Sequence, residues 1–122
     1  MALEFYIRNN KPDTFARTIF NKSLKVKSKV ALKGPKGNFV LKEAFSALPM
    51  LFIAWDGGFA SIRSLVEHAF LLQMLNLMNF YWAYPATESA PYLDNHAKFW
   101  QTMIDKYTYH SIACEFDRYQ KK

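Results

Sequence analysis

Residues 68–87 read HAFLLQMLNLMNFYWAYPAT, and this stretch decides how the fold is interpreted because it contains no Asp, Glu, Lys or Arg. A helix of twenty residues is about 30 Å long, roughly the apolar thickness of a bilayer. Three amide side chains interrupt the run, namely Gln73, Asn76 and Asn79. Aromatic residues cluster at its end, as they do in the aromatic belt at a membrane interface; they are Phe80, Tyr81, Trp82 and Tyr84. The sequence therefore leaves two alternatives, a membrane-embedded segment or a buried helix of a helical core.

The wider centre of the chain, residues 43–87, is also apolar. Between residues 44 and 87 only Asp56, Arg63 and Glu67 are charged, and Pro49 and the Gly57-Gly58 pair divide the stretch into shorter pieces. Arg63 and Glu67 are four residues apart, the spacing at which opposite charges pair on a helix. We expect apolar central helices carrying this ion pair.

Positive charge is concentrated in residues 1–42, which hold ten Lys and Arg residues against two acids, a net charge of +8. Residues 43–122 have six basic and eight acidic residues, a net charge of −2. Residues 23–33 alternate between apolar and lysine positions, and residues 34–37, GPKG, form a turn before residues 38–42. This period of two predicts a basic β-hairpin or extended arm.

The lysines of this arm are Lys25, Lys27, Lys29, Lys33 and Lys36. Such a surface binds anionic groups, either lipid head groups or nucleic acid. The alternative is a solvated edge strand, in which lysines prevent aggregation. We expect contact with anionic groups.

Residues 88–122 show apolar positions at helical spacing, from Leu93 through Trp100 and Ile104 to Cys114. This pattern predicts a long amphipathic C-terminal helix that begins near Pro91 and has Asp94 on its solvated side. Trp100, Ile104 and Tyr107 form the expected docking face for a partner, because aromatic anchors dominate interfaces.

Residues that could carry chemistry are sparse. Cys114 is the single cysteine, which excludes an intrachain disulfide. His110 and Cys114 would share a helix face, but two ligands do not form a structural zinc site. We predict no catalytic residue, no metal site and no cofactor.

These patterns together predict a mostly α fold, a single domain over residues 1–122. The basic leader, the interrupted apolar centre and the amphipathic C-terminal helix favour a non-catalytic accessory subunit of a larger assembly, not an enzyme. The preferred setting is a respiratory-chain complex of the mitochondrial inner membrane, with other subunits and anionic lipid as partners. The alternative is a small basic subunit of a ribonucleoprotein, in the cytoplasm and bound to nucleic acid. A small soluble enzyme is the third interpretation.

Overall fold

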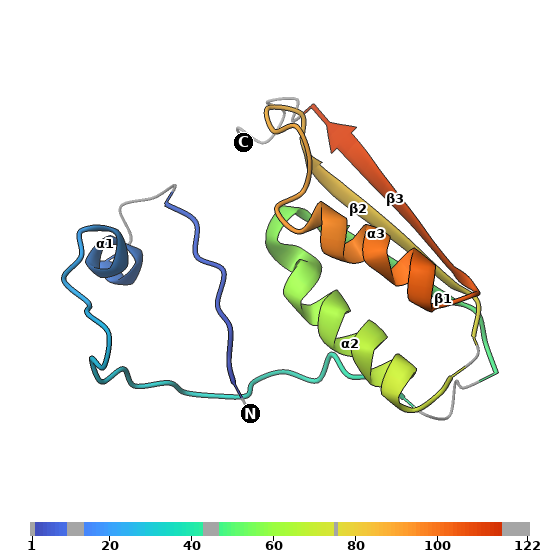
Figure 1. Ribbon diagram of the computed structural model, residues 1–122, viewed down its shortest axis with the longest axis horizontal. Coiled ribbons are helices and arrows are strands. Elements are labelled where there is room, and N and C mark those ends of the chain that lie inside the picture. Colours follow the sequence, from blue (N-terminus) through green and yellow to red (C-terminus); the bar gives the residue numbers. More distant parts are fainter. Residues whose placement is uncertain (1, 10–13, 43–46, 75, 116–122) are drawn as a thin grey trace, which may run out of the picture. The chain divides into compact units, whose positions relative to one another are not determined.

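The computed structural model describes residues 2–9, 14–42, 47–74 and 76–115. The chain divides into two compact units, Met1–Lys36 and Gly37–Lys122, and each is described by itself. The expectation that residues 1–122 form a single domain stays a prediction. The second unit holds the sheet and two of the helices, coloured green to red in Figure 1.

The second unit has a parallel three-stranded sheet in the order β1-β2-β3. Its strands are β1 (Met50–Trp55), β2 (Met78–Pro85) and β3 (Tyr107–Cys114), with Met50 opposite Met78 and Met78 opposite Tyr107. A 3-10 turn, η2 (Asp56–Gly58), and α2 (Phe59–Leu71) connect β1 to β2, and α3 (Asp94–Met103) connects β2 to β3. The prediction of a mostly α protein is therefore wrong, because the unit is α/β.

Both helices lie on one face of the sheet (Figure 1). Side chains on that face are buried because strand residues alternate between faces. The buried core holds the following residues: Phe52, Ala54, Phe59, Ile62, Leu65, Val66, Ala69, Met78, Phe80, Trp82, Ala97, Trp100, Tyr107 and Tyr109. Side chains on the opposite face are exposed, including Leu51, Ile53 and Ile112.

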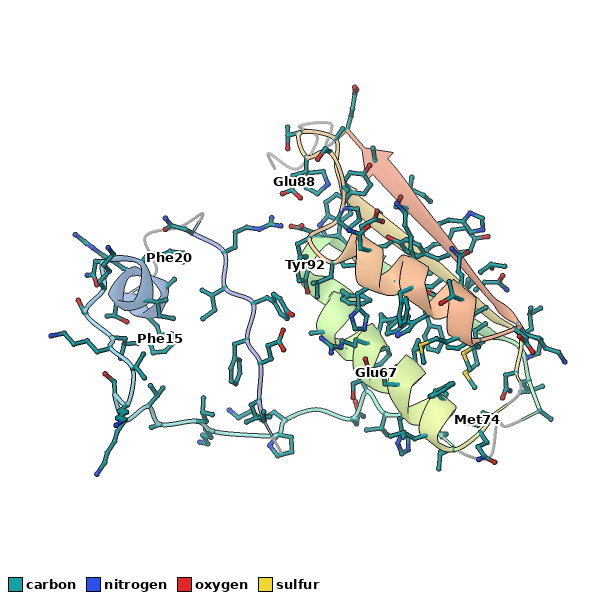
Figure 2. The ribbon with its side chains drawn as sticks, in the orientation of Figure 1. Phe15, Phe20, Glu67, Met74, Glu88 and Tyr92 are labelled. Atoms are coloured by element: carbon teal, nitrogen blue, oxygen red, sulfur yellow. The ribbon has the colours of Figure 1, made fainter. Side chains whose placement is uncertain are left out.

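The first unit contains a single helix among its described residues, α1 (Thr14–Phe20). Phe15 and Phe20, both labelled in Figure 2, are exposed on this helix. The chain then turns twice. Asn21 Oδ1 accepts a hydrogen bond from the Ser23 amide at 2.9 Å, and Ser28 donates its amide to the Lys25 carbonyl at 2.9 Å.

The predicted β-hairpin over residues 23–42 is wrong, since no strand forms in residues 14–42. The turn at Lys25–Ser28 is closed by a second bond, from the Lys25 amide to Ser28 Oγ at 3.0 Å. It places Lys27 in the left-handed region, with φ of 73°. This turn breaks the alternation, and Val26 is 94% exposed where a strand face would have buried it.

The interpretation of residues 68–87 as one helix is also wrong. α2 ends at Leu71, and the Gln73 and Met74 amides then bond back to the carbonyls of Phe70 and Ala69 at 3.0 Å each. Gln73 adopts φ of 53°, so the end is a Schellman motif without its usual glycine. Residues 78–85 of the stretch form β2 instead.

Across the described ranges, no helix is both long and apolar enough to cross a membrane.

The prediction of a long C-terminal helix is also wrong, because the predicted helix is again divided into a shorter helix and a strand. α3 ends at Met103, and Ile104 is extended, with φ of −122° and ψ of 109°. Residues 107–114, YTYHSIAC, are rich in β-branched and aromatic residues and form β3. Asp94 is not on a solvated side either, because it is only 9% exposed.

Candidate functional site

The turn between β1 and α2 is the most distinctive feature at the carboxyl edge of the sheet. Asp56, Gly57 and Gly58 form η2, and α2 begins at the next residue, Phe59. In open parallel sheets, ligands bind outside the carboxyl ends of the strands. The first amides of a helix attract anions because they have no partners within the helix.

The glycines keep the approach to this turn open. A Cβ atom added to Gly57 would meet nothing within 4 Å, and one added to Gly58 would lie 3.8 Å from the Ala54 Cβ. Gly58 has φ of −70°, which any residue can adopt. A side chain at residue 57 would start in open space, so the turn is not enclosed by neighbouring atoms at this position.

Two buried aromatic rings and one exposed ring pack against each other beside the turn. Trp82, fully buried on β2, donates its indole N–H to the Asp56 carbonyl oxygen at 2.9 Å. The Phe59 ring stacks on Trp82 with centroids 4.3 Å apart, and Tyr92 meets Trp82 edge-on at 5.4 Å. Figure 2 shows Tyr92 beside the start of α2. The turn is thus held in place before any ligand arrives.

The end of β2 is also fixed by hydrogen bonds. Ala86 donates its amide to the Cys114 carbonyl at 2.9 Å, which ties the end of β2 to the end of β3. Within the following loop, Glu88 donates its amide to Pro85 O at 3.0 Å. Two segments therefore lie at the carboxyl edge of the sheet: η2, which follows β1, and the loop that follows the neighbouring strand β2.

A buried polar pair supports α3 behind this edge. Tyr109 on β3 donates its hydroxyl to Asp94 Oδ1 at 2.7 Å. Burial raises the pKa of Tyr109 above its ordinary value, and the bond to Asp94 raises that pKa further. Asp94 also pairs with Lys98 at 2.6 Å. Tyr109 and Asp94 are buried, whereas Lys98 is exposed, so the bond between Tyr109 and Asp94 supports α3 from the core.

The predicted pair of Arg63 and Glu67 is confirmed, with Nε and Oε1 3.0 Å apart. The same Glu67 oxygen lies 3.2 Å from His96 Nε2, so the carboxylate joins α2 to α3. All three side chains are partly exposed. This cluster links the two helices on the surface, and its distances fit a structural role.

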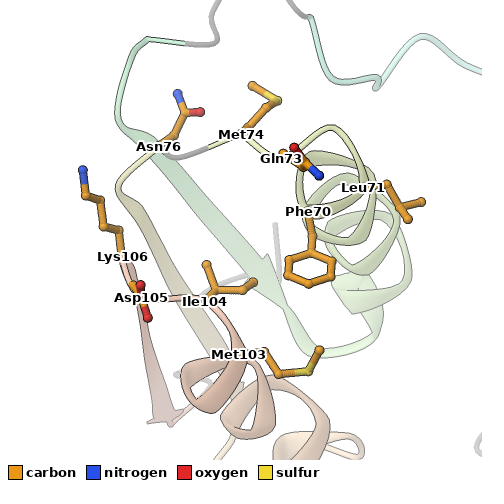
Figure 3. A pocket seen from close by; sticks show the side chains of 9 residues that line it. All are labelled: Phe70, Leu71, Gln73, Met74, Asn76, Met103, Ile104, Asp105 and Lys106. Atoms are coloured by element: carbon orange, nitrogen blue, oxygen red, sulfur yellow. The ribbon is translucent and has the colours of Figure 1, made fainter.

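A pocket of about 700 Å³ lies at the opposite, amino-terminal edge of the sheet. Figure 3 shows Phe70, Met103 and Ile104 pointing toward one another across it. Asp105 and Lys106 lie at the segment that leads into β3. Because parallel sheets bind ligands at their carboxyl ends, this pocket is not the candidate site.

The residues predicted to bind a partner or anionic groups are divided between the two units. The five lysines, Lys25, Lys27, Lys29, Lys33 and Lys36, are all exposed and belong to the first unit. Trp100 and Tyr107 are buried in the core, and Ile104 packs against it. Their proposed roles in binding a partner remain predictions.

Sequence reasoning took the Asp56-Gly57-Gly58 turn as a break between helices, with Asp56 as a possible cap for the following helix. The signal that could have found it is Met50–Trp55, a six-residue run of apolar residues before the glycines. A short apolar strand followed by glycines and a helix is the setting in which phosphate-binding βα turns occur, although residues 56–61 lack the G-x-G-x-x-G spacing of the dinucleotide motif. His110 and Cys114, paired on a predicted helix, instead lie on β3, about 13 Å apart along the strand.

Two of the proteins that match this chain are described here. The CDP-6-deoxy-L-threo-D-glycero-4-hexulose-3-dehydrase reductase of Yersinia pestis is 32% identical over 84 residues, which are 69% of this chain and 25% of that protein. The propane 2-monooxygenase reductase component of Rhodococcus jostii is 29% identical over 112 residues, 92% of this chain and 29% of that protein. The chain thus spans less than a third of either relative.

No family model matches the sequence. No solved structure matches the fold.

These relatives correct the functional predictions. Both are named reductases, so the interpretation as a non-catalytic accessory subunit is wrong, and so is the ribonucleoprotein alternative. Both come from bacteria, which contradicts the mitochondrial inner membrane and the respiratory-chain setting. One is named as a component, which agrees with the expectation of protein partners, whereas lipid and nucleic acid find no support.

Proposed function

We propose that this chain is the nucleotide-binding part of a reductase, and that its βα turn at residues 56–58 holds the phosphates of a dinucleotide. The observation that carries the proposal is the succession β1-α2-β2-α3-β3 in a parallel sheet of order β1-β2-β3. One such βαβαβ unit is half of a dinucleotide-binding fold.

The chemistry of the turn supports this assignment. The amides at the start of α2 supply a positive electrostatic potential, and Gly57 leaves the backbone accessible. Trp82 and Phe59 hold the turn in position from the core. A reduced nicotinamide dinucleotide would supply a hydride when bound, and the residues described here would bind and orient it.

The names of the two relatives provide the second support, because both proteins are reductases. The identity of the final acceptor does not follow from a match that spans about a quarter of each relative. We therefore propose reductase chemistry for the complete protein and nucleotide binding for the residues of this chain.

We also propose that the partner is a protein component with an acidic surface. The five exposed lysines of the first unit are the observation that favours it, since opposite charges steer the association of two proteins. The name of the Rhodococcus relative, a reductase component, agrees with such a partner.

Equilibrium dialysis with NADH, ADP and adenosine tests the proposed site. If the turn binds phosphate, NADH and ADP bind measurably and adenosine binds much more weakly. Equal binding of ADP and adenosine would remove the turn from the site. Failure of both NADH and ADP to bind would contradict the proposed function.

A further inference from the structure

The residue that opens the βα turn is unusual for a phosphate site. Asp56 has φ of 46°, in the left-handed region that favours glycine and that aspartate and asparagine tolerate best among the other residues. Its side chain is acidic, and it lies two residues before Gly58, the N-cap of α2. A negative charge therefore occupies the turn that we propose for phosphate.

Asp56 cannot easily leave this position. The indole of Trp82 holds its carbonyl oxygen at 2.9 Å, and Trp82 is itself fully buried. Asp56 is only partly exposed. Because consecutive Cα atoms are about 3.8 Å apart, the Cα atom of Asp56 lies within about 8 Å of the Cα atom of Gly58, the N-cap of α2. That separation is shorter than the Debye length of about 10 Å at 0.1 M salt, so salt screens the interaction only in part.

The charge of Asp56 has two opposite effects. Near the start of a helix, an acidic side chain interacts favourably with the helix dipole and stabilises the protein. Toward an incoming phosphate the same carboxylate is repulsive, and it reduces the positive potential that the amides offer. The first effect acts on folding, whereas the second acts only on ligand binding, so the two can be measured separately.

We infer that Asp56 sets the affinity of this site, by opposing the phosphates of the dinucleotide and keeping its binding weak. The inference rests on the proposed function, because it concerns the same turn. Weak binding shortens the residence time of the ligand, since affinity differences at one site arise mostly in the dissociation rate. Asp56 is a specificity-determining residue in this account, one that disfavours ligands with more negative charge at the turn.

The test is a fluorescence titration of the 122-residue chain with NADH at low ionic strength. Asp56→Asn removes the charge and keeps a residue that tolerates the left-handed conformation. Asp105→Asn is the matched control, because it makes the same charge change at the amino-terminal edge of the sheet. Melting temperatures of both variants establish that each is folded.

We expect Asp56→Asn to bind NADH about tenfold more tightly than the parent chain, and Asp105→Asn to bind like the parent. The difference should shrink at about 1 M NaCl, where the Debye length is about 3 Å. Equal affinity of the parent and Asp56→Asn, or an equal gain in both variants, would overturn the inference while leaving the proposed function intact. Absence of binding in all three proteins would instead overturn the proposed function, and the inference with it.

Discussion

The indole N–H of Trp82 donates a hydrogen bond to the main-chain oxygen of Asp56 at 2.9 Å. It connects the buried centre of β2 to the turn that follows β1, twenty-six residues earlier. The backbone of the candidate site is therefore positioned by a side chain from the neighbouring strand and not by the turn alone.

Replacing Trp82 by Phe should lower the free energy of unfolding by about 2–3 kcal/mol. The change leaves a small cavity under Phe59 and removes the hydrogen bond to Asp56. Urea denaturation measures this effect. Tyr81→Phe on the outer face is the control and should change stability by less than about 0.5 kcal/mol. Equal stability of Trp82→Phe and the parent would show that the indole does not hold the turn.

Stability should fall above pH 10. Burial raises the pKa of Tyr107 and of Tyr109 above their ordinary value of 10.0. A raised pKa means that the folded state holds the phenol proton more tightly, so the contribution is complete below pH 10 and is lost as pH rises. Each tyrosine can contribute a slope of at most about 1.4 kcal/mol per pH unit.

The measurement is urea denaturation at several pH values from about 8 upward, a range that includes the ordinary tyrosine pKa of 10.0. The Tyr107→Phe and Tyr109→Phe variants should each show a shallower alkaline decline than the parent. An unchanged decline in both variants would assign alkaline unfolding to other groups.

Trp100→Ala should cost about 3–5 kcal/mol, because Trp100 is only 5% exposed and its ring packs against Phe59 and Tyr107. A loss of this size is a large share of the stability of a small domain. Thermal melting followed by circular dichroism tests it. Thr102→Ala on the exposed side of α3 is the control, and similar melting of both variants would contradict the packing described here.

Changing Lys25, Lys27, Lys29, Lys33 and Lys36 together to Gln should weaken binding to an acidic polypeptide such as polyglutamate. Removal of five charges should also flatten the dependence of that binding on salt, because fewer ion pairs form. Lys106→Gln in the second unit is the single-charge control. If the fivefold variant binds polyglutamate as the parent does, the lysines are only solubilising.

The sequence indicated the Arg63–Glu67 pair, which depends on local spacing. It failed where tertiary context decides. Residues 78–85 and 107–114 are apolar or aromatic enough to fit a helical stripe, but they pair in a parallel sheet whose partners are distant in the chain. Short apolar runs of this kind do not distinguish a strand from a buried helix by periodicity.

The candidate site was missed for a related reason. Gln73 ends α2 in a conformation usually taken by glycine, so no residue type marked the end of the helix before β2. Because β2 was not predicted, no parallel sheet was expected either, and nothing indicated that the glycines at residues 57 and 58 lie at the carboxyl edge of a sheet. Asp56 further obscured the signal, because aspartate is an ordinary residue for capping a helix.

The most direct test of the central claim is a titration of Gly57→Val with NADH. A Cβ at residue 57 meets nothing within 4 Å, so the variant should fold and melt like the parent chain. Its side chain would occupy the space through which a phosphate reaches the first amides of α2. We predict that Gly57→Val loses measurable NADH binding while the parent retains it. Parent-like binding of NADH by a folded Gly57→Val variant would contradict the claim that this turn holds the dinucleotide.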